Sequence, residues 1–447
     1  MITVGLYTLG CKVSQYETEA ISEKFESSGC KINSFSEVND VYVINTCTVT
    51  AESDRKSRQF IRRAIKKNPD AVVAVVGCYS QRSAEEAAAI DGVDIVIGTD
   101  GKLSVVDLAL RHLDFKRCGI PCEKTVSVCD VGKVGFEPMR ITKAPRTRAY
   151  VKIEDGCESK CTYCAISDAR GRVRSKKRED VLCEVAALFD SGIGEVVLTG
   201  IETGSYGRDF EEKYSLADLI CELDSLCPEG KIRLGSLSPE LIDGDFVDKV
   251  SKTKILLPHF HLSMQSGSNA VLRRMKRRYT RERALENIRK IKDAFPDANF
   301  TTDLMVGFPG ESEEDFLLTC DFVRKAGFID AHVFAYSRRK NTPAYDYEDQ
   351  IEESVKSERS ERLIKHKNTV RDRILSSMVE GKMPVIAIAE SIDKNGFVAA
   401  HSESFVEIRF LPKAHLGCAE SLFGKWLKLI PVSHKDGILY CEQIDLV

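Results

Sequence analysis

The stretch "GCESKCTYCAI" (residues 156–166) carries three cysteines, Cys157, Cys161 and Cys164, with the spacing C-x3-C-x2-C. Three thiolates on one short loop fit a metal site with an open fourth position, which distinguishes catalytic from structural metal sites. One interpretation is zinc with a distant His or Cys as fourth ligand. Another is a 4Fe-4S cluster whose fourth iron binds a substrate or cofactor. The plain alternative is three structural cysteines.

The triad directly follows the first strand of a long series in which apolar strands alternate with amphipathic helical patterns. Such alternation is typical of a parallel α/β architecture. Six βα units are too few for an eight-stranded barrel, so residues 146–375 are expected to form a partial, open (β/α)6 barrel. Reactive groups of parallel barrels lie at the C-terminal strand ends, where this triad falls. The expected strands are 149–155, 195–200, 231–237, 260–265, 300–308 and 331–337.

The flanking regions have a different character. Residues 1–115 show short apolar strands at 3–10, 41–45, 71–77 and 93–98, separated by helical patterns, which predicts an open parallel α/β sheet domain. A stretch rich in Gly, Pro and basic residues, 116–145, is expected to be a linker. A charged helix over 351–380 leads into residues 376–447, whose period-two alternation predicts a small all-β barrel.

Three more cysteines follow strands of the N-terminal sheet: Cys11, Cys47 and Cys78. In an open α/β sheet, ligands bind outside the carboxyl ends of the strands, so these cysteines can converge in space. Each also lies near a predicted helix N-terminus, which is expected to lower the thiol pKa and favour metal binding. The alternative is that they are small core residues. We predict a second cluster, again with one iron left open.

Composition sets limits on location and partners. The chain has 447 residues, 16 cysteines and a net charge of −3. It opens with no export signal, and the apolar run 71–79 is far shorter than the roughly 20 residues of a membrane span. We therefore expect a cytoplasmic protein with reduced cysteines and no membrane association. Cys118, Cys122 and Cys129 are interpreted as incidental.

A nucleic-acid partner would have to bind local basic patches, because the chain has no bulk positive charge. One patch places basic residues at helical spacing, and two others are the runs 169–178 and 273–283, the last with Tyr279 available for stacking. Solvated surface charge is the alternative for each. The helical patch consists of Arg55, Arg58, Arg62 and Lys66.

The loop triad resembles the signature of radical S-adenosylmethionine (SAM) enzymes, and the aromatic residue before Cys164 matches it too. The resemblance implies a 4Fe-4S cluster whose open iron binds the amino and carboxylate groups of SAM. It also implies SAM contacts at later strand ends, in "VLTGIE" (197–202), "HLSMQSGS" (261–268) and "TDLMVGFPGE" (302–311). The cofactor-binding residues expected on this basis are Tyr163, Thr199, Gly200, Gln265, Asp303 and Gly307.

Both triads together resemble the methylthiotransferase family of radical SAM enzymes over essentially the whole chain. That family has an N-terminal cluster domain, a radical SAM partial barrel and a C-terminal β-barrel called TRAM. The stretches "GCKVSQYETEA" (10–20), "NTCTVTAESDRKSRQFIRRA" (45–64) and "HVFAYSRRKNTPA" (332–344) are most similar to one branch of it. That branch modifies N6-threonylcarbamoyladenosine (t6A) in tRNA.

The resemblance implies that a methylthio group is placed on C2 of t6A at position 37 of tRNA. The cofactors would be two 4Fe-4S clusters and SAM, with one cluster generating a 5′-deoxyadenosyl radical and the other delivering sulfur. The implied partners are the tRNA anticodon stem-loop, an external low-potential electron donor and a sulfur source. Two alternatives keep the chemistry but change the substrate to isopentenyladenosine of tRNA or a ribosomal protein aspartate. An alternative of another class is a non-catalytic iron–sulfur or zinc RNA-binding protein.

Overall fold

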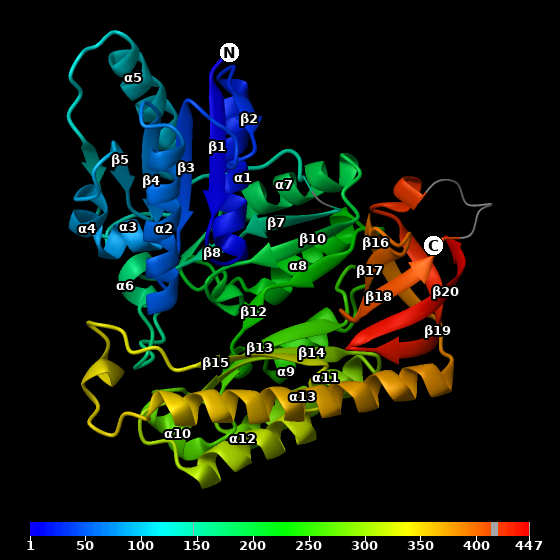
Figure 1. Cartoon of the computed structure of the whole chain (residues 1–447). Coiled ribbons are helices and arrows are strands. Elements are labelled where there is room, and N and C mark those ends of the chain that lie inside the picture. The colour runs from blue at the N-terminus through cyan, green and yellow to red at the C-terminus, as the bar shows by residue number, and fades with distance from the viewer. Residues whose placement is uncertain (146, 413–418, 447) are drawn as a thin grey trace.

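The structure is a computed structural model that describes residues 1–145, 147–412 and 419–446. Three parts follow one another along the chain, as the colours of Figure 1 show. The first is a parallel sheet with helices on both faces, the second contains two further parallel sheets, and the third is a closed barrel. Among the described residues, no helix combines the length and apolar character that crossing a membrane needs.

The N-terminal sheet has the strand order β2-β1-β3-β4-β5-β6, and all neighbouring strands run parallel. The four strands predicted from the sequence are confirmed as β1, β3, β4 and β5. The strands are β1 (Thr3–Thr8), β2 (Lys31–Asn33), β3 (Val41–Thr46), β4 (Val72–Gly77), β5 (Ile95–Ile97) and β6 (Thr125–Ser127). The helices are α1 (Lys12–Ser27), α2 (Ala51–Lys67), α3 (Cys78–Arg82), α4 (Ala84–Ala88), η1 (Lys102–Ser104) and α5 (Val105–Arg117).

Strand β6 lies within the stretch 116–145 that was expected to be a linker. It pairs with β5 and thereby extends the N-terminal sheet, so the linker prediction is wrong for these three residues. Its side chains are mostly exposed, and a strand of this length leaves no hydrophobic period to recognise. The same shortness explains why β2 was not predicted.

Helices cover both faces of this sheet. Every residue of β3 and β4 is buried, as expected for central strands of a parallel sheet. Residues of α1 and α5 pack on one face, and residues of α2 pack on the other. Helix α1 also contributes Tyr16 and Ala20 to the core of the second part, where they join Ala149 and Val151 of β7. The first turns of α1 are thereby held between the two parts.

In the second part, two parallel sheets have the orders β11-β10-β7 and β12-β13-β14-β15. The chain passes from one sheet to the other at Gly235, between β11 and β12. The strands predicted at 195–200, 260–265, 300–308 and 331–337 are confirmed. The strand predicted at 149–155 is β7 followed by β8 as a separate short strand, and the single strand predicted at 231–237 is wrong, because it is divided into β11 and β12 of different sheets. The strands are β7 (Arg148–Lys152), β8 (Glu154–Asp155), β9 (Arg174–Ser175), β10 (Glu195–Thr199), β11 (Ile232–Leu234), β12 (Ser236–Leu237), β13 (His259–Gln265), β14 (Asn299–Val306) and β15 (Asp330–Ala335).

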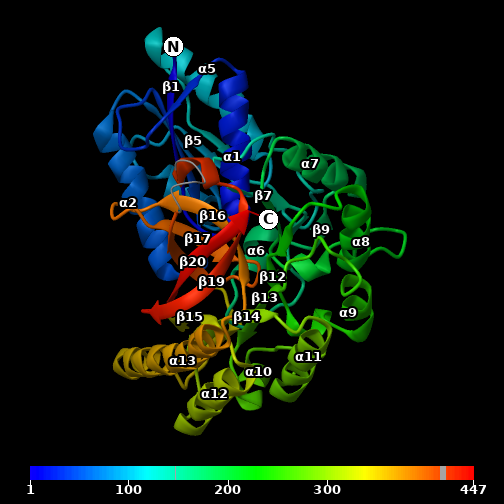
Figure 2. The same ribbon diagram turned by 90° about the vertical axis from the view of Figure 1, so that its right-hand side faces the viewer.

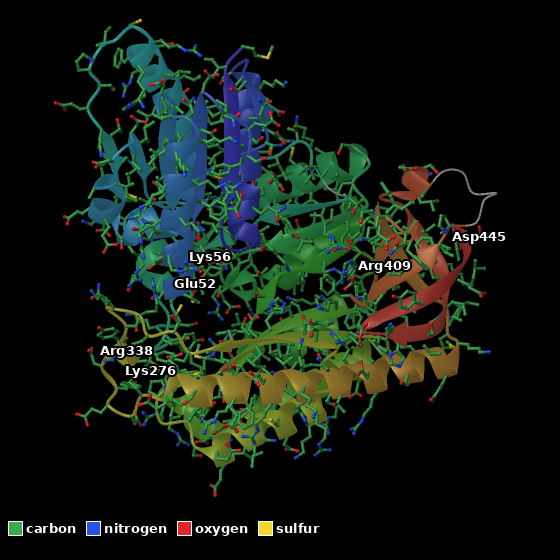
Figure 3. All side chains as sticks on the ribbon, in the orientation of Figure 1. Glu52, Lys56, Lys276, Arg338, Arg409 and Asp445 are labelled. Atoms are coloured by element: carbon green, nitrogen blue, oxygen red, sulfur yellow. The ribbon has the colours of Figure 1, made fainter. Side chains whose placement is uncertain are left out.

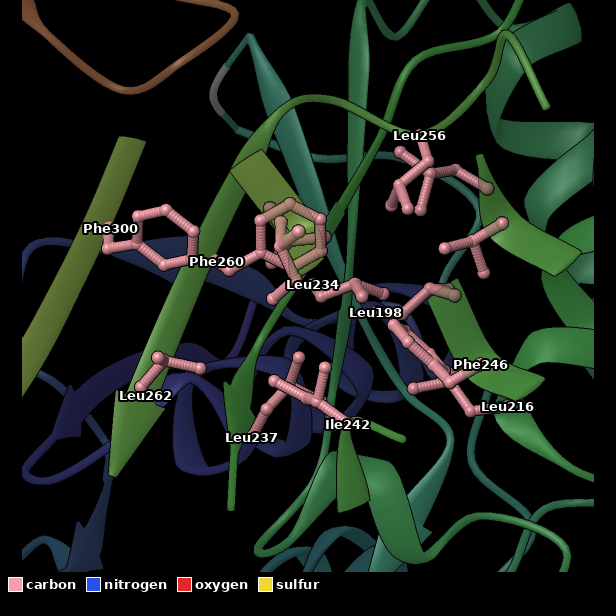
Figure 4. Packing of buried hydrophobic residues seen from close by; sticks show 14 of the residues in the cluster. Leu198, Leu216, Leu234, Leu237, Ile242, Phe246, Leu256, Phe260, Leu262 and Phe300 are labelled. Carbon is pink, nitrogen blue, oxygen red and sulfur yellow. The ribbon is translucent and has the colours of Figure 1, made fainter. Parts of the chain in front are cut away.

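Helices of the second part follow one another along the outer side of these strands (Figure 2). Between strands and helices lies a large apolar core, in which Leu198, Phe260 and Phe300 are fully buried (Figure 4). The helices are α6 (Ile166–Arg170), α7 (Arg178–Asp190), η2 (Thr203–Ser205), α8 (Leu216–Leu226), η3 (Pro239–Leu241), α9 (Gly244–Val250), α10 (Asn269–Arg274), α11 (Arg281–Ala294), α12 (Glu313–Ala326), η4 (Pro343–Asp346) and α13 (Glu353–Gly381).

The third part is a closed barrel with the strand order β16-β17-β18-β20-β19, which confirms the predicted all-β barrel. The long helix α13 connects the second part to it. Trp426 Nε1 donates to the carbonyl of Gly194 at 3.0 Å, so the barrel is anchored on the second part. The strands are β16 (Val385–Ile392), β17 (Val398–Ser402), β18 (Glu407–Leu411), β19 (Trp426–Lys435) and β20 (Ile438–Leu446), and one short helix, η6, spans Ala419–Leu422.

Candidate metal centres

The loop triad, Cys157, Cys161 and Cys164, lies between β8 and α6. Backbone amides point at two of its sulfurs: Ser159 N lies 3.5 Å from Cys157 Sγ, and Ile166 N lies 3.4 Å from Cys164 Sγ. Amide donors of this kind stabilise thiolates and metal-bound sulfur. All three cysteines line one hollow of about 610 Å³. The loop therefore presents three sulfurs to a common space.

Burial raises the pKa of Cys157, and it raises the pKa of Cys164 to about 12. The neighbouring thiols add to the increase at Cys164. Without a metal, Cys157 and Cys164 therefore keep their protons at neutral pH. A metal displaces such protons when it binds, because the coordinating form is the thiolate.

The N-terminal triad, Cys11, Cys47 and Cys78, occupies three adjacent strand ends, as predicted. Cys11 follows β1, Cys47 follows β3, and Cys78 follows β4 and begins α3. A Cβ atom added at Gly10 would lie 3.4 Å from Cys47 Sγ, so the backbone beside Cys11 packs against Cys47. Both Cys78 and Cys11 affect the pKa of Cys47 electrostatically. The fold thus brings together three cysteines that are far apart in sequence.

The expectation of lowered thiol pKa values in this triad is wrong for two of its members. Burial raises the pKa of Cys47 to about 11 and also raises the pKa of Cys78, despite the nearby Arg170. Helix α3 has only five residues, and α2 begins four residues after Cys47. The effect of a helix N-terminus falls off within one turn, so desolvation outweighs it here.

A cavity of about 310 Å³ lies beside the loop triad. Val49 and Thr50, which follow Cys47, line one side of it, and Cys164 lines another. Strand residues from β13, β14 and β15 complete its wall. The remaining lining residues are Tyr163, Ala165, Ile166, Gln265, Asp303, Met305, His332, Phe334, Ala335, Tyr336 and Ser337.

Two polar side chains in this wall have features suited to a ligand. Gln265 adopts a positive φ of 66°, and its Oε1 is buried with no hydrogen-bond partner among the described residues. Asp303 Oδ2 lies 3.2 Å from His261 Nε2. Burial raises the pKa of Asp303, but the hydrogen bond and charge of His261 lower it overall. Asp303 therefore presents a carboxylate to the cavity.

The six predicted cofactor contacts fall into two groups. Tyr163, Gln265 and Asp303 line the cavity together. Thr199, Gly200 and Gly307 are not among its lining residues. Gly307 has φ +67°, and a Cβ atom there would lie 2.3 Å from Lys356 Cγ, so helix α13 packs against this turn. The cofactor role of this second group stays a prediction.

Two buried carboxyl groups near the loop triad were not assigned from the sequence. Glu154 Oε2 accepts from the amide of Glu202 at 2.8 Å, while Glu154 Oε1 has no partner among the described residues. Burial raises the pKa of Glu202 to about 7 and that of Glu154 well above its usual range. Such a pair suits an ammonium group of a ligand. Their signal in the sequence is an acidic residue at the end of each of two neighbouring strands.

The basic patches differ in their accessibility. Arg58, Arg62 and Lys66 on α2 line an open hollow of about 660 Å³. Arg170 and Arg174 in the second run are buried, so that run is not simply a surface patch. In the third run Tyr279 is 5% exposed and donates to the Met264 carbonyl, so its expected availability for stacking is wrong.

Three exposed basic residues lie on segments close to the loop triad or the start of α2. Figure 3 labels Lys56 at the lower end of α2, and Lys276 and Arg338 on the segments below it. The start of α2 contacts the segment of Arg338, because the amide of Ala51 donates to Ser337 Oγ at 3.1 Å. Lys56, Lys276 and Arg338 are all exposed. Lys276 lines the hollow of the loop triad and provides positive charge there.

No group of three His, Cys, Asp or Glu side chains in the described part of the chain is arranged to hold a single metal ion. That includes Cys118, Cys122 and Cys129, of which Cys122 contacts His112 at 3.4 Å instead. The role of the six cysteines of the two triads as metal ligands stays a prediction.

Comparisons with known families match most of the chain. Residues 151–323 match the Radical SAM superfamily, and residues 3–98 match a family described as uncharacterized protein family UPF0004. The solved radical SAM methyltransferase TsrM from Kitasatospora setae, with cobalamin and a 4Fe-4S cluster bound, is similar with a TM-score of 0.55 and 15% identity over 77% of each chain. This likeness supports the fold alone.

Curated relatives are more similar in sequence. The threonylcarbamoyladenosine tRNA methylthiotransferase MtaB of Bacillus subtilis is 40% identical over 96% of this chain and 93% of its own length. The enzyme of the same name from Thermotoga maritima is 35% identical over 92% of each. A tRNA-2-methylthio-N(6)-dimethylallyladenosine synthase of Desulforamulus reducens is 35% identical over 84% of each.

Proposed function

The chain belongs to the methylthiotransferase family of radical SAM enzymes, and we propose that it places a methylthio group on C2 of t6A at position 37 of tRNA. Relatives named for t6A match at 40% and 35% identity over more than nine-tenths of the chain. The relative named for dimethylallyladenosine matches over 84% of it. The additional coverage and identity favour t6A as the substrate.

Its cofactors are SAM and 4Fe-4S clusters, as in the relatives that define the family. When bound, they supply reductive cleavage of SAM and a site for the sulfur that is transferred. We assign one cluster to Cys157, Cys161 and Cys164 and the other to Cys11, Cys47 and Cys78. The shared hollow of the loop triad and the adjacent strand ends of the N-terminal triad support these assignments.

The observation that carries the proposal is the cavity beside the loop triad. It is lined by Cys164 and by Thr50, which follows Cys47 by three residues, so a base bound there would lie beside the loop triad and next to the segment that follows Cys47. Gln265 and Asp303 offer an unpartnered amide oxygen and a carboxylate for polar groups of SAM or the substrate. The unpartnered oxygen of Glu154 suits the SAM ammonium group.

We propose three domains with boundaries at residues 1–115, 146–375 and 376–447. The six strands β7, β10, β11/β12, β13, β14 and β15 follow one another in chain order across two parallel sheets, which supports a partial (β/α)6 barrel. The closed five-stranded barrel supports a TRAM domain. Residues 116–145 connect the first two domains, and they include β6, which pairs with β5 of the first domain.

The remaining partners follow from the reaction. The tRNA anticodon stem-loop would contact the cations around the cavity, because phosphates dominate RNA affinity. A modified base in a loop can be splayed into such a cavity. Reductive chemistry needs an external low-potential electron donor, and each transferred sulfur must come from a sulfur source.

A synthetic anticodon stem-loop carrying t6A tests the proposal. Anaerobic protein with SAM and a reductant should add the mass of one methylthio group, detected by nucleoside mass spectrometry. The matched stem-loop carrying isopentenyladenosine should react much more slowly. If only the isopentenyl form reacts, the substrate assignment is wrong. Binding of RNA with no cleavage of SAM would instead favour a non-catalytic iron–sulfur or zinc protein.

A further inference from the structure

Arg170 connects the two cysteine triads. It ends α6, six residues after Cys164, and its side chain is fully buried. Its Nε donates a hydrogen bond to Cys78 Sγ at 3.2 Å. A residue from the segment that carries the loop triad thus contacts a sulfur of the N-terminal triad.

Two carboxylates fix the orientation of Arg170. Its Nη1 lies 2.6 Å from Glu17 Oε1 and 3.0 Å from Asp155 Oδ2. Glu17 follows Cys11 on α1, and Asp155 lies two residues before Cys157. Because a guanidinium presents its donors in a rigid planar fork, these contacts also direct Nε toward Cys78.

In the surrounding network cations outnumber carboxyl groups, even with the partly buried Glu137, which acts electrostatically on Lys102 and Lys152. Lys102, Lys152 and Arg174 join Arg170, so four cations share the carboxylates of Glu17 and Asp155. None of these side chains is more than 6% exposed. Buried charge is costly without a counter-charge. The Cys78 sulfur at the edge of the network becomes anionic when it binds a metal.

We propose that Arg170 is a positioning residue for the cluster of the N-terminal triad, and that it holds the Cys78 sulfur and raises the reduction potential of that cluster. The proposal rests on the proposed function. A hydrogen bond to a ligand sulfur stabilises the more negative reduced cluster and so raises its potential.

The other triad offers a matched contrast. Arg277 Nη1 donates to Cys161 Sγ at 3.2 Å, and its Nη2 is held by the carbonyl of Ser263 at 2.8 Å. Each triad therefore has an arginine on one of its sulfurs. The two arginines should act on different clusters.

The test is a redox titration followed by electron paramagnetic resonance on anaerobically reconstituted protein. The N-terminal cluster is read alone in a background of Cys157→Ala, Cys161→Ala and Cys164→Ala. The loop cluster is read alone in a background of Cys11→Ala, Cys47→Ala and Cys78→Ala. Arg170→Lys keeps the charge but loses the planar fork, and it should lower the midpoint potential of the N-terminal cluster only. Arg277→Lys should lower that of the loop cluster only.

Lys152→Arg is the structural control. It makes the reverse exchange within the same network, where Lys152 contacts Glu17 and Asp155, and it should leave both potentials unchanged. An unchanged potential in folded, iron-loaded Arg170→Lys overturns the proposal. So does an equal fall in Lys152→Arg, or an unfolded Arg170→Lys beside a folded Lys152→Arg.

These titrations need no tRNA, so they separate this proposal from the substrate assignment. A shifted potential without methylthiolation of t6A would leave the role of Arg170 intact and overturn the substrate. Failure of the wild-type N-terminal triad to bind iron would overturn the two-cluster function, and the role of Arg170 with it.

Discussion

At the scale of single residues, Gly156 closes the base of the loop triad. Its φ is +93°, and a Cβ atom there would lie 1.9 Å from the carbonyl oxygen of Arg172. The next residue, Cys157, donates its amide to the Gly171 carbonyl at 2.9 Å. The backbone of Arg172 cannot move aside as easily as a flexible side chain. Any residue larger than glycine at position 156 must therefore displace the base of the cysteine loop.

We therefore predict that Gly156→Ala reduces the iron content by about four atoms per chain, the content of one 4Fe-4S cluster. The physical reason is that the displaced loop no longer aligns its three cysteines. Iron analysis of anaerobically reconstituted protein measures the effect, and formation of 5′-deoxyadenosine should fall with it.

Gly29→Ala is the control for this substitution. Gly29 has a similar φ of +81°, but nothing lies within 4 Å of the added Cβ. Gly29→Ala should lower the free energy of unfolding by only roughly 1–2 kcal/mol, the cost of an alanine in the left-handed conformation. It should keep all the iron. Equal iron loss in both variants would show that backbone strain, not the contact with Arg172, is responsible.

At the scale of elements, the turn between β17 and β18 docks the barrel on the second part. Phe405 stacks on His259 and His401 with ring centroids 4.5 Å and 5.0 Å apart. Arg148 and Arg233 lie over the same ring. Burial, together with these two arginines, lowers the pKa of His401 to about 4 and that of His259 well below its usual range.

This arrangement predicts that the two histidines contribute less to stability at pH 5 than at pH 7.5. Both histidines are neutral when folded but take up protons when unfolded below about pH 6.5, so their contribution to the free energy of unfolding rises with pH across this window. His401 alone would contribute up to about 2 kcal/mol. Thermal unfolding at several pH values measures it.

The charged groups around these histidines are of both signs. Besides the two arginines, Lys12 and His261 act on His259, while Glu195, Glu390 and Glu407 lie near His401. A double variant, His259→Gln with His401→Gln, should lose this contribution. Burial raises the pKa of Glu202 and Glu154, which acts in the opposite direction, so the measurement is the difference between the wild type and the double variant at each pH. The same difference at pH 5 and pH 7.5 would contradict the prediction.

Helix α2 is the element best placed to contact RNA phosphates. Arg58, Arg62 and Lys66 share an open hollow on one face of it. Replacing all three with Gln should weaken tRNA binding and reduce its dependence on salt, by up to roughly one unit of slope for each phosphate that is no longer neutralised. Fluorescence anisotropy over a salt series measures both quantities.

Lys252→Gln with Lys254→Gln provides the comparison, since Lys252 is exposed, Lys254 is also exposed, and both follow α9 on the second part. This variant should bind tRNA as the wild type does. If the α2 variant keeps the wild-type salt slope, its cations do not contact phosphate.

At the scale of the whole molecule, the sequence predicts those features that depend on the spacing of apolar residues along the chain and on the order of strands in a parallel sheet. Buried parallel strands have continuous apolar runs, and cysteines directly after three such strands must meet at one sheet edge. The triads and most strands were predictable for this reason. Strands β2 and β6 were not predictable, because a half-exposed strand of three residues is too short to show a recognisable pattern of apolar residues.

Contacts between distant segments were not predictable. Arg170 belongs to a basic run that suggests a solvated face, yet its partners Glu17 and Cys78 lie 153 and 92 positions away. The expected thiol pKa values were wrong for a related reason. Desolvation depends on what packs over a cysteine, and this comes from other parts of the chain.

The division of labour between the triads gives the last prediction. Wild-type protein should hold about eight irons and eight sulfides, the content of two 4Fe-4S clusters. Replacing Cys157, Cys161 and Cys164 with Ala should leave about four irons and abolish 5′-deoxyadenosine, because SAM loses its binding iron. Replacing Cys11, Cys47 and Cys78 should also leave about four irons. This second variant should still cleave some SAM but form no methylthiolated t6A, since the site for sulfur is gone.

Mössbauer spectra and product analysis on the same samples distinguish the two variants. Full product formation by the second variant would rule out a sulfur-delivering role for the N-terminal triad and leave the loop triad as the single reactive centre.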